Sequence, residues 1–360
     1  MRSFRRPVIF RAAVALGAVA LTASACGSSS KTGSSPPSTA TAPQATTAGG
    51  PSGDWQQLVA QAKKEGQVTF YSSQGLDQLN AVAKAFKAKY GITVNVSRNI
   101  DATDEAKISA ENSSGSRIAD VVSFADSSYV QAKGQLGWWT PPTGPDFNNP
   151  AYDKATNVQT DGSFVTSAAV YAIGWNTQIV PKGISSYAQI LNPQYKGKIG
   201  IPDAATSPVV VDFYGFVQQQ TSSDFLTKLA ALKPQVFSSV LQIAQNLTSG
   251  QVAVGLAVAP LVTQKQAGAP VDFIVPKPAW GARFYTTIVK NSPHPAAAQL
   301  LADFLVTPEG QAALAAQSAS VLPNTPGSVA QVANVRAIDP ANLQPAHVQQ
   351  FDSNFKSLFQ

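Results

Sequence analysis

The stretch SFVTSAAVYAIGWNT, from Ser163 to Thr177, sets the architecture of this chain. It is a long run of apolar and β-branched residues without a helical period, which predicts a strand. The chain before it and the chain after it each alternate between predicted strands and helices. We therefore interpret the stretch as a crossover strand that joins two α/β lobes. Because open α/β sheets bind ligands beyond the carboxyl ends of their strands, the groove between the lobes is the expected functional site.

The start of the chain indicates an export signal. Basic residues open it, at Arg2, Arg5, Arg6 and Arg11. The apolar segment Ala12–Ala25 that follows has only 14 residues, whereas a membrane-spanning helix needs roughly 20. Cys26 comes directly after Ala23-Ser24-Ala25, which resembles the lipobox of bacterial lipoproteins, although Ala23 stands where leucine is usual. We expect residues 1–25 to be a lipoprotein signal peptide and Cys26 to be lipidated. The alternative is an ordinary cleaved signal with an incidental cysteine.

Residues 26–53 are the expected disordered linker, because a segment of almost only Ser, Thr, Pro, Gly and Ala cannot bury enough apolar surface to fold. The net charge of +6 and the pI of about 9.3 come mainly from the signal. When the four arginines of the signal and Lys31 are left out, the rest of the chain has 21 basic and 20 acidic residues. This balance argues against nucleic acid as a partner. A single cysteine allows no internal disulfide and no thiolate metal site.

The rest of the chain predicts two lobes of alternating strands and helices. Residues 67–96 contain a strand, a helix and a strand, which is a βαβ unit, and residues 283–289 form an uninterrupted strand that would return the chain to the first lobe. We assign residues 54–162 and 283–310 to the first lobe, and residues 163–282 and 311–360 to the second lobe with the crossover strands.

Seven fragments, in order along residues 65–315, resemble the extracellular solute-binding proteins of ABC importers, in the branch that binds iron(III), thiamine and putrescine. They are VTFYSS (68–73), IADVVS (118–123), YAIGWNT (171–177), LNPQYKGKIGIP (191–202), SGQVAVG (249–255), GAPVDFIVP (268–276) and VTPEGQ (306–311). The resemblance implies a type 2 periplasmic-binding-protein fold, whose two lobes close like a hinge over a small-molecule solute. It also implies delivery to an ABC permease, no cofactor and no enzymatic activity. We expect a monomer that is exported and lipid-anchored on the outer face of the cytoplasmic membrane.

Candidate ligand-binding residues of the first lobe follow two predicted strands. Ser72, Ser73 and Gln74 come after the strand that ends at residue 71, and their hydroxyls and the amides of the next helix suit an oxyanion or a phosphate. Ser123 and Asp126 come at the end of the strand predicted over residues 118–124. The alternative for the serines is capping of the following helix. Asp126 either pairs with a cationic group of the ligand or caps its own helix.

Candidate residues of the second lobe surround the other wall of the groove. Thr206 and Ser207 precede a helix that opens with Pro208, and its positive N-terminal end is a second candidate anion site. Capping is again the alternative, and it can coexist with ligand binding. Trp280 lies in a loop before the returning strand, where it would form either a groove wall or part of the core. Tyr285, on that strand, is a further aromatic candidate.

Three other functions compete with binding of an anionic organic solute. The resembling iron(III)-binding proteins carry adjacent tyrosines after the strand that matches residues 251–257, but here the place reads VAPL (258–261) and the histidines are only His294 and His347. Ferric iron needs several oxygen or imidazole ligands, so we expect no metal site. A secreted hydrolase lacks support from any GxSxG, HExxH or Walker motif, although paired carboxylates leave glycoside hydrolysis open. A surface lipoprotein without a ligand is the third possibility.

Overall fold

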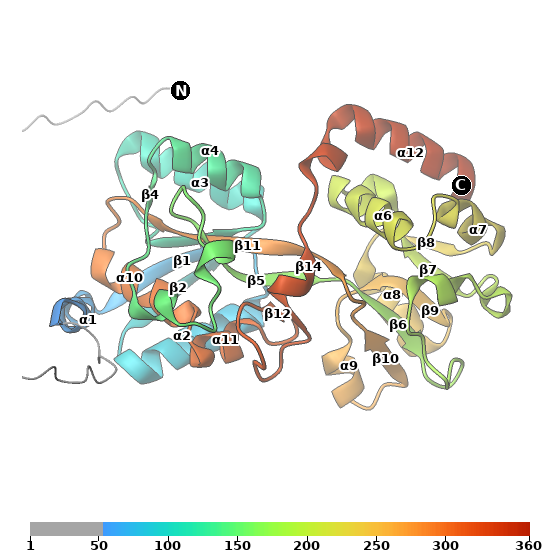
Figure 1. The fold of residues 1–360 in the computed structure, drawn as a ribbon, viewed down its shortest axis with the longest axis horizontal. Coiled ribbons are helices and arrows are strands. Elements are labelled where there is room, and N and C mark those ends of the chain that lie inside the picture. Colours follow the sequence, from blue (N-terminus) through green and yellow to red (C-terminus); the bar gives the residue numbers. More distant parts are fainter. Residues whose placement is uncertain (1–52) are drawn as a thin grey trace, which may run out of the picture. The chain divides into compact units, whose positions relative to one another are not determined.

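The computed structural model describes residues 53–360. The predicted signal peptide (1–25), Cys26 and the predicted linker up to residue 52 lie outside the described residues. Within the described part of the chain, no helix is both long enough and apolar enough to cross a membrane. The described chain is an α/β protein with two sheets, as predicted from the sequence (Figure 1).

The first sheet has the strand order β13-β12-β5-β11-β3-β1-β2, with β14 and β4 paired to β11. Its strands are β1 (Gln67–Ser72), β2 (Thr93–Arg98), β3 (Val121–Phe124), β4 (Trp139–Thr140), β5 (Phe164–Val170), β11 (Ala279–Val289), β12 (Ala319–Ser320), β13 (Ala330–Gln331) and β14 (Val335–Arg336). Strands β1, β2 and β3 are parallel, and β11 runs antiparallel to both β3 and β5. Strands β1, β2, β3 and β5 therefore end at the same edge of the sheet.

The second sheet has the order β10-β6-β9-β7-β8. Its strands are β6 (Ala172–Asn176), β7 (Ile199–Pro202), β8 (Gln235–Phe237), β9 (Val254–Val258) and β10 (Val271–Ile274). Strand β7 is parallel to β8 and β9, whereas β6 is antiparallel to β9 and β10. The loops after β7 and β9 therefore leave the same edge, where β6 begins.

Helices cover both faces of the first sheet (Figure 1). Those on one face are α1 (Gly53–Glu65), α2 (Leu76–Tyr90), α10 (Pro295–Leu305) and α11 (Pro308–Leu314), and those on the other are α3 (Asp101–Ser114) and α4 (Ser127–Gln135). Alternation along the strands explains the two layers. Val121 of β3 is buried with Phe86 of α2, whereas Val122 is buried with Ile108 of α3 and Val130 of α4. Two short helices, η1 (Pro145–Asn148) and α5 (Lys154–Asn157), precede β5.

The second sheet is also covered on two sides. The largest core cluster packs α6 (Pro208–Gln220), α7 (Phe225–Ala231) and α12 (Pro345–Phe359) through Phe213, Phe225 and Phe355. A separate cluster packs α8 (Val240–Ser249) through Ile243 and Leu247, near α9 (Val262–Gln266). The short helices of this half and of the C-terminal segment are η2 (Tyr187–Leu191), η3 (Pro193–Tyr195), η4 (Ala204–Thr206), η5 (Val332–Asn334) and η6 (Pro340–Leu343).

Within the described residues, the chain passes between the two sheets three times. The predicted crossover at Ser163–Thr177 is confirmed, because β5 belongs to the first sheet, β6 to the second, and only Tyr171 separates them. The second connection leads from β10 to β11, and the predicted returning strand is longer than expected, since it starts at Ala279. The third connection leads from β14 through η6 to α12, which packs on α6 and α7.

The structure divides the segment 311–360, which the sequence analysis assigned to the second lobe. Helix α11 packs on α2, and β12 pairs with β5, so this part belongs with the first sheet. Gln311 explains the attachment, because its side chain donates to the carbonyl of Thr166 at 2.9 Å and accepts from the Ser320 hydroxyl at 2.8 Å. Farther along, η6 and α12 pack against helices of the second lobe, and Arg336 reaches Asp212 on α6. Gln317 also contacts this lobe, because it accepts a hydrogen bond from the Thr263 hydroxyl on α9 at 3.3 Å.

Strand β3 begins three residues later than the predicted strand 118–124. The reason is the buried carboxylate of Glu111, which accepts the backbone amides of Ile118 at 2.9 Å and Ala119 at 3.0 Å. These amides are thereby bound to a side chain and not to a neighbouring strand.

Candidate functional site

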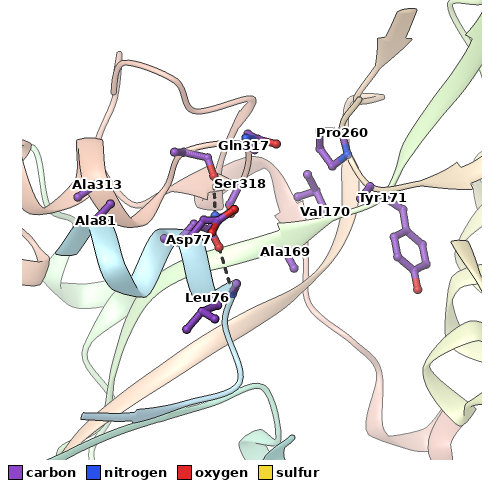
Figure 2. A pocket seen from close by; sticks show the side chains of 14 residues that line it. Leu76, Asp77, Ala81, Ala169, Val170, Tyr171, Pro260, Ala313, Gln317 and Ser318 are labelled. Carbon is purple, nitrogen blue, oxygen red and sulfur yellow. Dashed lines mark hydrogen bonds between the residues drawn. The ribbon is translucent and has the colours of Figure 1, made fainter. Parts of the chain in front are cut away.

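A cavity of about 480 Å³ lies where the first crossover meets the edges of both sheets. We call it the hinge pocket (Figure 2). Its walls are Gly75–Gln78 at the start of α2, Ala169–Tyr171 at the crossover, Ala259–Pro260 after β9, and Ala316–Ser318 after α11. The pocket is therefore built by both lobes and by the connection between them.

The hinge pocket has a mainly apolar lining with few polar groups. Leu76 is 52% exposed there, and Val170 and Pro260 face it from the crossover and the second lobe. Asp77 is its only charged residue. Gln78 is fully used in holding the wall together, because its Nε2 donates to the Ala316 carbonyl and the Ser318 hydroxyl while its Oε1 accepts the Gly75 amide (Figure 2).

Tyr171 is the aromatic residue of the hinge pocket. Its ring centroid lies 4.7 Å from that of Trp280 and 5.1 Å from that of Phe213. Burial raises the pKa of the Tyr171 hydroxyl, so the hydroxyl stays protonated and can donate a hydrogen bond. The sequence analysis did not single out this residue, although it lies in the middle of the crossover stretch.

The end of β1 and the loop after it hold two of the predicted residues in buried positions. Ser72 is fully buried and Gln74 is 3% exposed. The Gln74 amide donates to the Ser72 hydroxyl at 3.2 Å, and its Nε2 donates to the hydroxyl of Ser167 on β5 at 2.8 Å. These two side chains therefore shape the loop, whereas the half-buried Ser73 keeps part of its surface accessible.

Arg98 is a positively charged residue at this loop that the sequence analysis missed. It ends β2 directly beside Ser72. Its Nε donates to the Gln74 carbonyl at 3.3 Å, and its Nη2 donates to the Ser73 carbonyl at 3.5 Å. Its position could have been inferred only from the strand register, because in a parallel pair the ends of β1 and β2 meet at one edge.

Ser123 is buried inside the first sheet. It accepts a hydrogen bond from the Thr286 hydroxyl at 2.9 Å, and the Thr286 hydroxyl also lies 2.9 Å from that of Thr166. The three hydroxyls thus link β3, β11 and β5. Since Ser123 has no exposed surface, its role in the structure is to join strands.

Asp126 caps α4, as the alternative interpretation expected. Its Oδ1 accepts the amides of Ser128 at 2.9 Å and Tyr129 at 3.0 Å. Asp101 accepts the amides of Ala125 and Asp126 itself. Burial, together with the carboxylates of Asp126 and Asp101, raises the pKa of nearby Glu105 to about 7. We call these three carboxyl groups, Asp101, Glu105 and Asp126, the acidic edge.

Thr206 and Ser207 lie at the start of α6, at the edge of the second sheet. The Ser207 hydroxyl accepts the Val209 amide at 3.2 Å, which makes Ser207 the N-cap. The Thr206 hydroxyl donates to the Asp203 carbonyl at 2.7 Å. Thr206 is exposed and Ser207 half-buried, so both side chains remain reachable by a ligand.

Trp280 does not form a wall of the groove, because it is only 2% exposed and belongs to the core of the second lobe. Its Nε1 donates to the Asp212 carboxylate at 2.7 Å. Tyr285 is half-buried and lines a separate cavity of about 390 Å³ beside α4, with Ser127 and Ser128. None of the nine residues predicted to bind ligand lines the hinge pocket, which begins at Gly75, directly after Gln74.

Metal ligands were not found together in the described part of the chain. No group of three or more His, Cys, Asp or Glu side chains among residues 53–360 could hold a metal ion. The loop after β9, where the resembling iron(III)-binding proteins carry tyrosines, contributes Ala259 and Pro260 to the hinge pocket.

Comparisons with known proteins agree with this architecture. The family model for bacterial extracellular solute-binding proteins matches residues 68–317. No curated protein matches the chain. Solved structures with the same fold include iron-bound HitA from Pseudomonas aeruginosa, with a TM-score of 0.58, 19% identity and coverage of 82% of this chain and 99% of that one.

Two further solved structures share this fold. AfuA from Actinobacillus pleuropneumoniae, bound to fructose-6-phosphate, has a TM-score of 0.54 and 21% identity, covering 81% of this chain and 98% of that one. An ABC transporter substrate-binding protein from Bradyrhizobium japonicum has a TM-score of 0.60 and 20% identity, covering 82% and 99%. At these identities the similarity establishes the fold.

Proposed function

This chain belongs to the bacterial extracellular solute-binding proteins, and from that premise we propose that it is the substrate-binding component of an ABC importer. It captures a small organic solute at the hinge pocket and delivers it to a permease in the membrane. The observation that carries this proposal is that the pocket wall comes from both lobes, at Gly75–Gln78 and at Ala259–Pro260. A solute held there gains contacts when the lobes close, so binding favours the closed state.

An organic solute fits the hinge pocket better than ferric iron does. The side chains of Leu76, Val170 and Pro260 offer apolar surface and no metal ligands. Hard metal ions require several oxygen ligands in a fixed arrangement. A solute with a carbon skeleton would instead bury apolar area against these residues and the ring of Tyr171.

An anionic group on the solute is best accommodated away from Asp77. The guanidinium of Arg98 and the half-buried Ser73 lie together at the loop after β1, and Ser207 begins α6 in the other lobe. A guanidinium and a helix N-terminus both favour carboxylate or phosphate. Asp77 and the acidic edge would repel such a group, so they restrict where it can bind.

Export and anchoring complete the proposed role. Cys26, outside the described residues, is the proposed attachment point for a diacylglycerol and an N-acyl chain, which together give stable anchoring. Labelled palmitate should be incorporated into the full chain and not into a Cys26→Ser variant, which should be released from the membrane. Equal labelling of both proteins would contradict the anchor.

Thermal unfolding with a panel of solutes tests the proposed function. The panel contains phosphonates, sugar phosphates, carboxylates, polyamines, thiamine and ferric complexes. A solute at 100 times its Kd stabilises the protein by about 2.7 kcal/mol. We expect an anionic organic solute to raise the melting temperature, Arg98→Ala to reduce the rise, and Lys84→Ala, an exposed site on α2, to leave it unchanged. A rise with ferric iron alone would contradict the proposal, and recovery of a cleaved solute would favour a hydrolase.

A further inference from the structure

Helix α6 carries one carboxylate in its buried face. Asp212 is charged but has no exposed surface, like its apolar neighbours Val211 and Phe213, which belong to the core. Its Oδ2 accepts the indole N–H of Trp280 at 2.7 Å. Its Oδ1 accepts a second set of donors: Asn342 Nδ2 at 2.7 Å, the Asp339 amide at 3.2 Å and Arg336 Nη1 at 3.5 Å.

The donors to Asp212 come from two of the three connections between the sheets. Trp280 is the second residue of β11, in the second connection. Arg336 ends β14, and Asp339 and Asn342 lie in the third connection around η6. The two connections are also joined directly, because Trp280 and Arg336 are partners in the β11–β14 pair. One carboxylate therefore fastens both connections to α6.

A buried carboxylate with several donors is a strong and directional contact. Replacing this carboxylate with an amide would leave the N–H groups of one of the two connections facing another donor, which is costly in a buried position. Arg336 adds to the same assembly, since its guanidinium lies 5.7 Å from the ring centroid of Phe216 on α6. The start of α6 at Ser207, the indole and η6 are thus held as one body.

Among the described residues, no buried carboxylate joins these connections to a helix of the first lobe. There, β5 and β11 are held by their ladder, and Arg283 Nη2 donates to the Val335 carbonyl at 2.8 Å. Tyr171 bonds to the second connection only through its amide, which donates to the Trp280 carbonyl at 3.2 Å. Gly281 follows Trp280, and a Cβ at this position would lie 2.2 Å from the carbonyl oxygen of Ala169. The two connecting strands therefore approach closely here, where a side chain would force them apart.

We propose that Asp212 is a positioning residue of the solute site. It makes α6, Trp280 and the Arg336–Asn342 segment move together, so that the lobes bend next to Tyr171 and Gly281. The inference rests on the proposed function, because the bending motion would serve to close the two lobes over a bound solute. Asp212 itself contacts no wall of the hinge pocket and acts through Trp280 and Tyr171.

The test compares two buried carboxylates in the full chain. Asp212→Asn is the perturbation, and Asp120→Asn is the matched control. Asp120 is equally buried, and it accepts the Thr69 amide at 2.7 Å and the His294 amide at 2.8 Å, all within the first lobe. Both variants lose a buried carboxylate that accepts backbone amides. Only Asp212 contacts the connections between the lobes.

The measurement is the distance between spin labels on the two lobes. Cys26 is the only cysteine of the chain, so Cys26→Ser allows labels at Lys84→Cys and Thr227→Cys, which are exposed positions on α2 and α7. Without solute, Asp212→Asn should roughly double the width of the distance distribution, because more relative lobe positions become populated. Asp120→Asn should keep the original width at a similar loss of stability.

A width unchanged in Asp212→Asn, or equally broadened in Asp120→Asn, would overturn the inference. If Asp212→Asn does not fold, Trp280→Phe is the second variant, because it removes one donor to Asp212 and keeps an aromatic ring. It should broaden the distance distribution by a smaller amount. An unchanged width in Trp280→Phe would also overturn the inference. Because no solute is present, this result is independent of the solute panel, so a failure of the proposed function and a failure of this inference can be told apart.

Discussion

A single buried carboxyl group, Asp303 on α10, should make the protein less stable as the pH rises toward neutrality. Asp303 is 2% exposed, and its Oδ1 accepts the Asp146 amide at 2.8 Å. Gly144 packs so closely that a Cβ there would lie 2.1 Å from the same oxygen. The pKa of Asp303 is raised to about 7, mainly by burial, with the Asp146 carboxylate adding to the increase and the Asp146 amide opposing it.

The sign and size of the effect follow from these values. The ordinary pKa of the group is 3.8, so between pH 3.8 and about 7 the folded protein holds a proton that the unfolded chain releases. The stabilisation is complete below pH 3.8 and is lost as the pH rises through about 7. A difference of about three pH units in pKa corresponds to about 4 kcal/mol of unfolding free energy.

Chemical denaturation at pH 5 and pH 8 measures the effect. Asp303→Asn keeps an oxygen for the Asp146 amide but cannot ionise, so its unfolding free energy should change less between the two pH values. The difference between original protein and variant should grow in favour of the variant by a few kcal/mol from pH 5 to pH 8. Asp224→Asn, at the exposed N-cap position of α7, is the control and should follow the original protein. Parallel pH profiles for the original protein and Asp303→Asn would refute the reasoning.

Three further predictions concern the site. Tyr171→Ala should abolish the solute-induced rise in melting temperature, whereas Tyr171→Phe, which keeps the ring, should retain part of it. In the original protein, calorimetry should show that the affinity for an anionic solute rises severalfold from pH 8 to pH 6, because the Glu105 carboxyl, with a pKa of about 7, loses its charge. Glu105→Gln cannot ionise and should flatten this pH dependence. Ser207→Ala should lower the unfolding free energy by about 1 kcal/mol through loss of the α6 cap, and equal stability in denaturation would contradict the cap.

The sequence predicted the architecture because its signals are local. The crossover stretch is an unbroken apolar run, and the strand–helix alternation on both sides is visible in residue spacing. The third connection was missed because β13 and β14 have only two residues each and lie in a segment without periodicity. Its pairing with β11 depends on residues more than fifty positions apart, such as Trp280 and Arg336.

The candidate site was less predictable than the fold, because a polar residue after a strand has two possible partners. Gln74 was expected to face a ligand, but its amide reaches Ser167, 93 positions further along the chain. Ser123 meets Thr286 in the same way. Sequence position brings such residues to the correct edge of the sheet, whereas the register of distant strands decides whether their polar atoms are already satisfied. We therefore propose less conspicuous residues, such as Tyr171 and Arg98, as the ligand contacts.

Trp280 links the site to the second lobe even though it is buried. Its indole is fixed at one end by the Asp212 carboxylate and lies with its ring centroid 4.7 Å from that of Tyr171. The ring of Tyr171 is thus connected through Trp280 to a carboxylate within α6, the helix that Thr206 and Ser207 precede. A change at Asp212 can consequently alter solute affinity without touching the solute. Selectivity in this protein is thus expected to respond to core residues of the second lobe as well as to the residues that line the pocket.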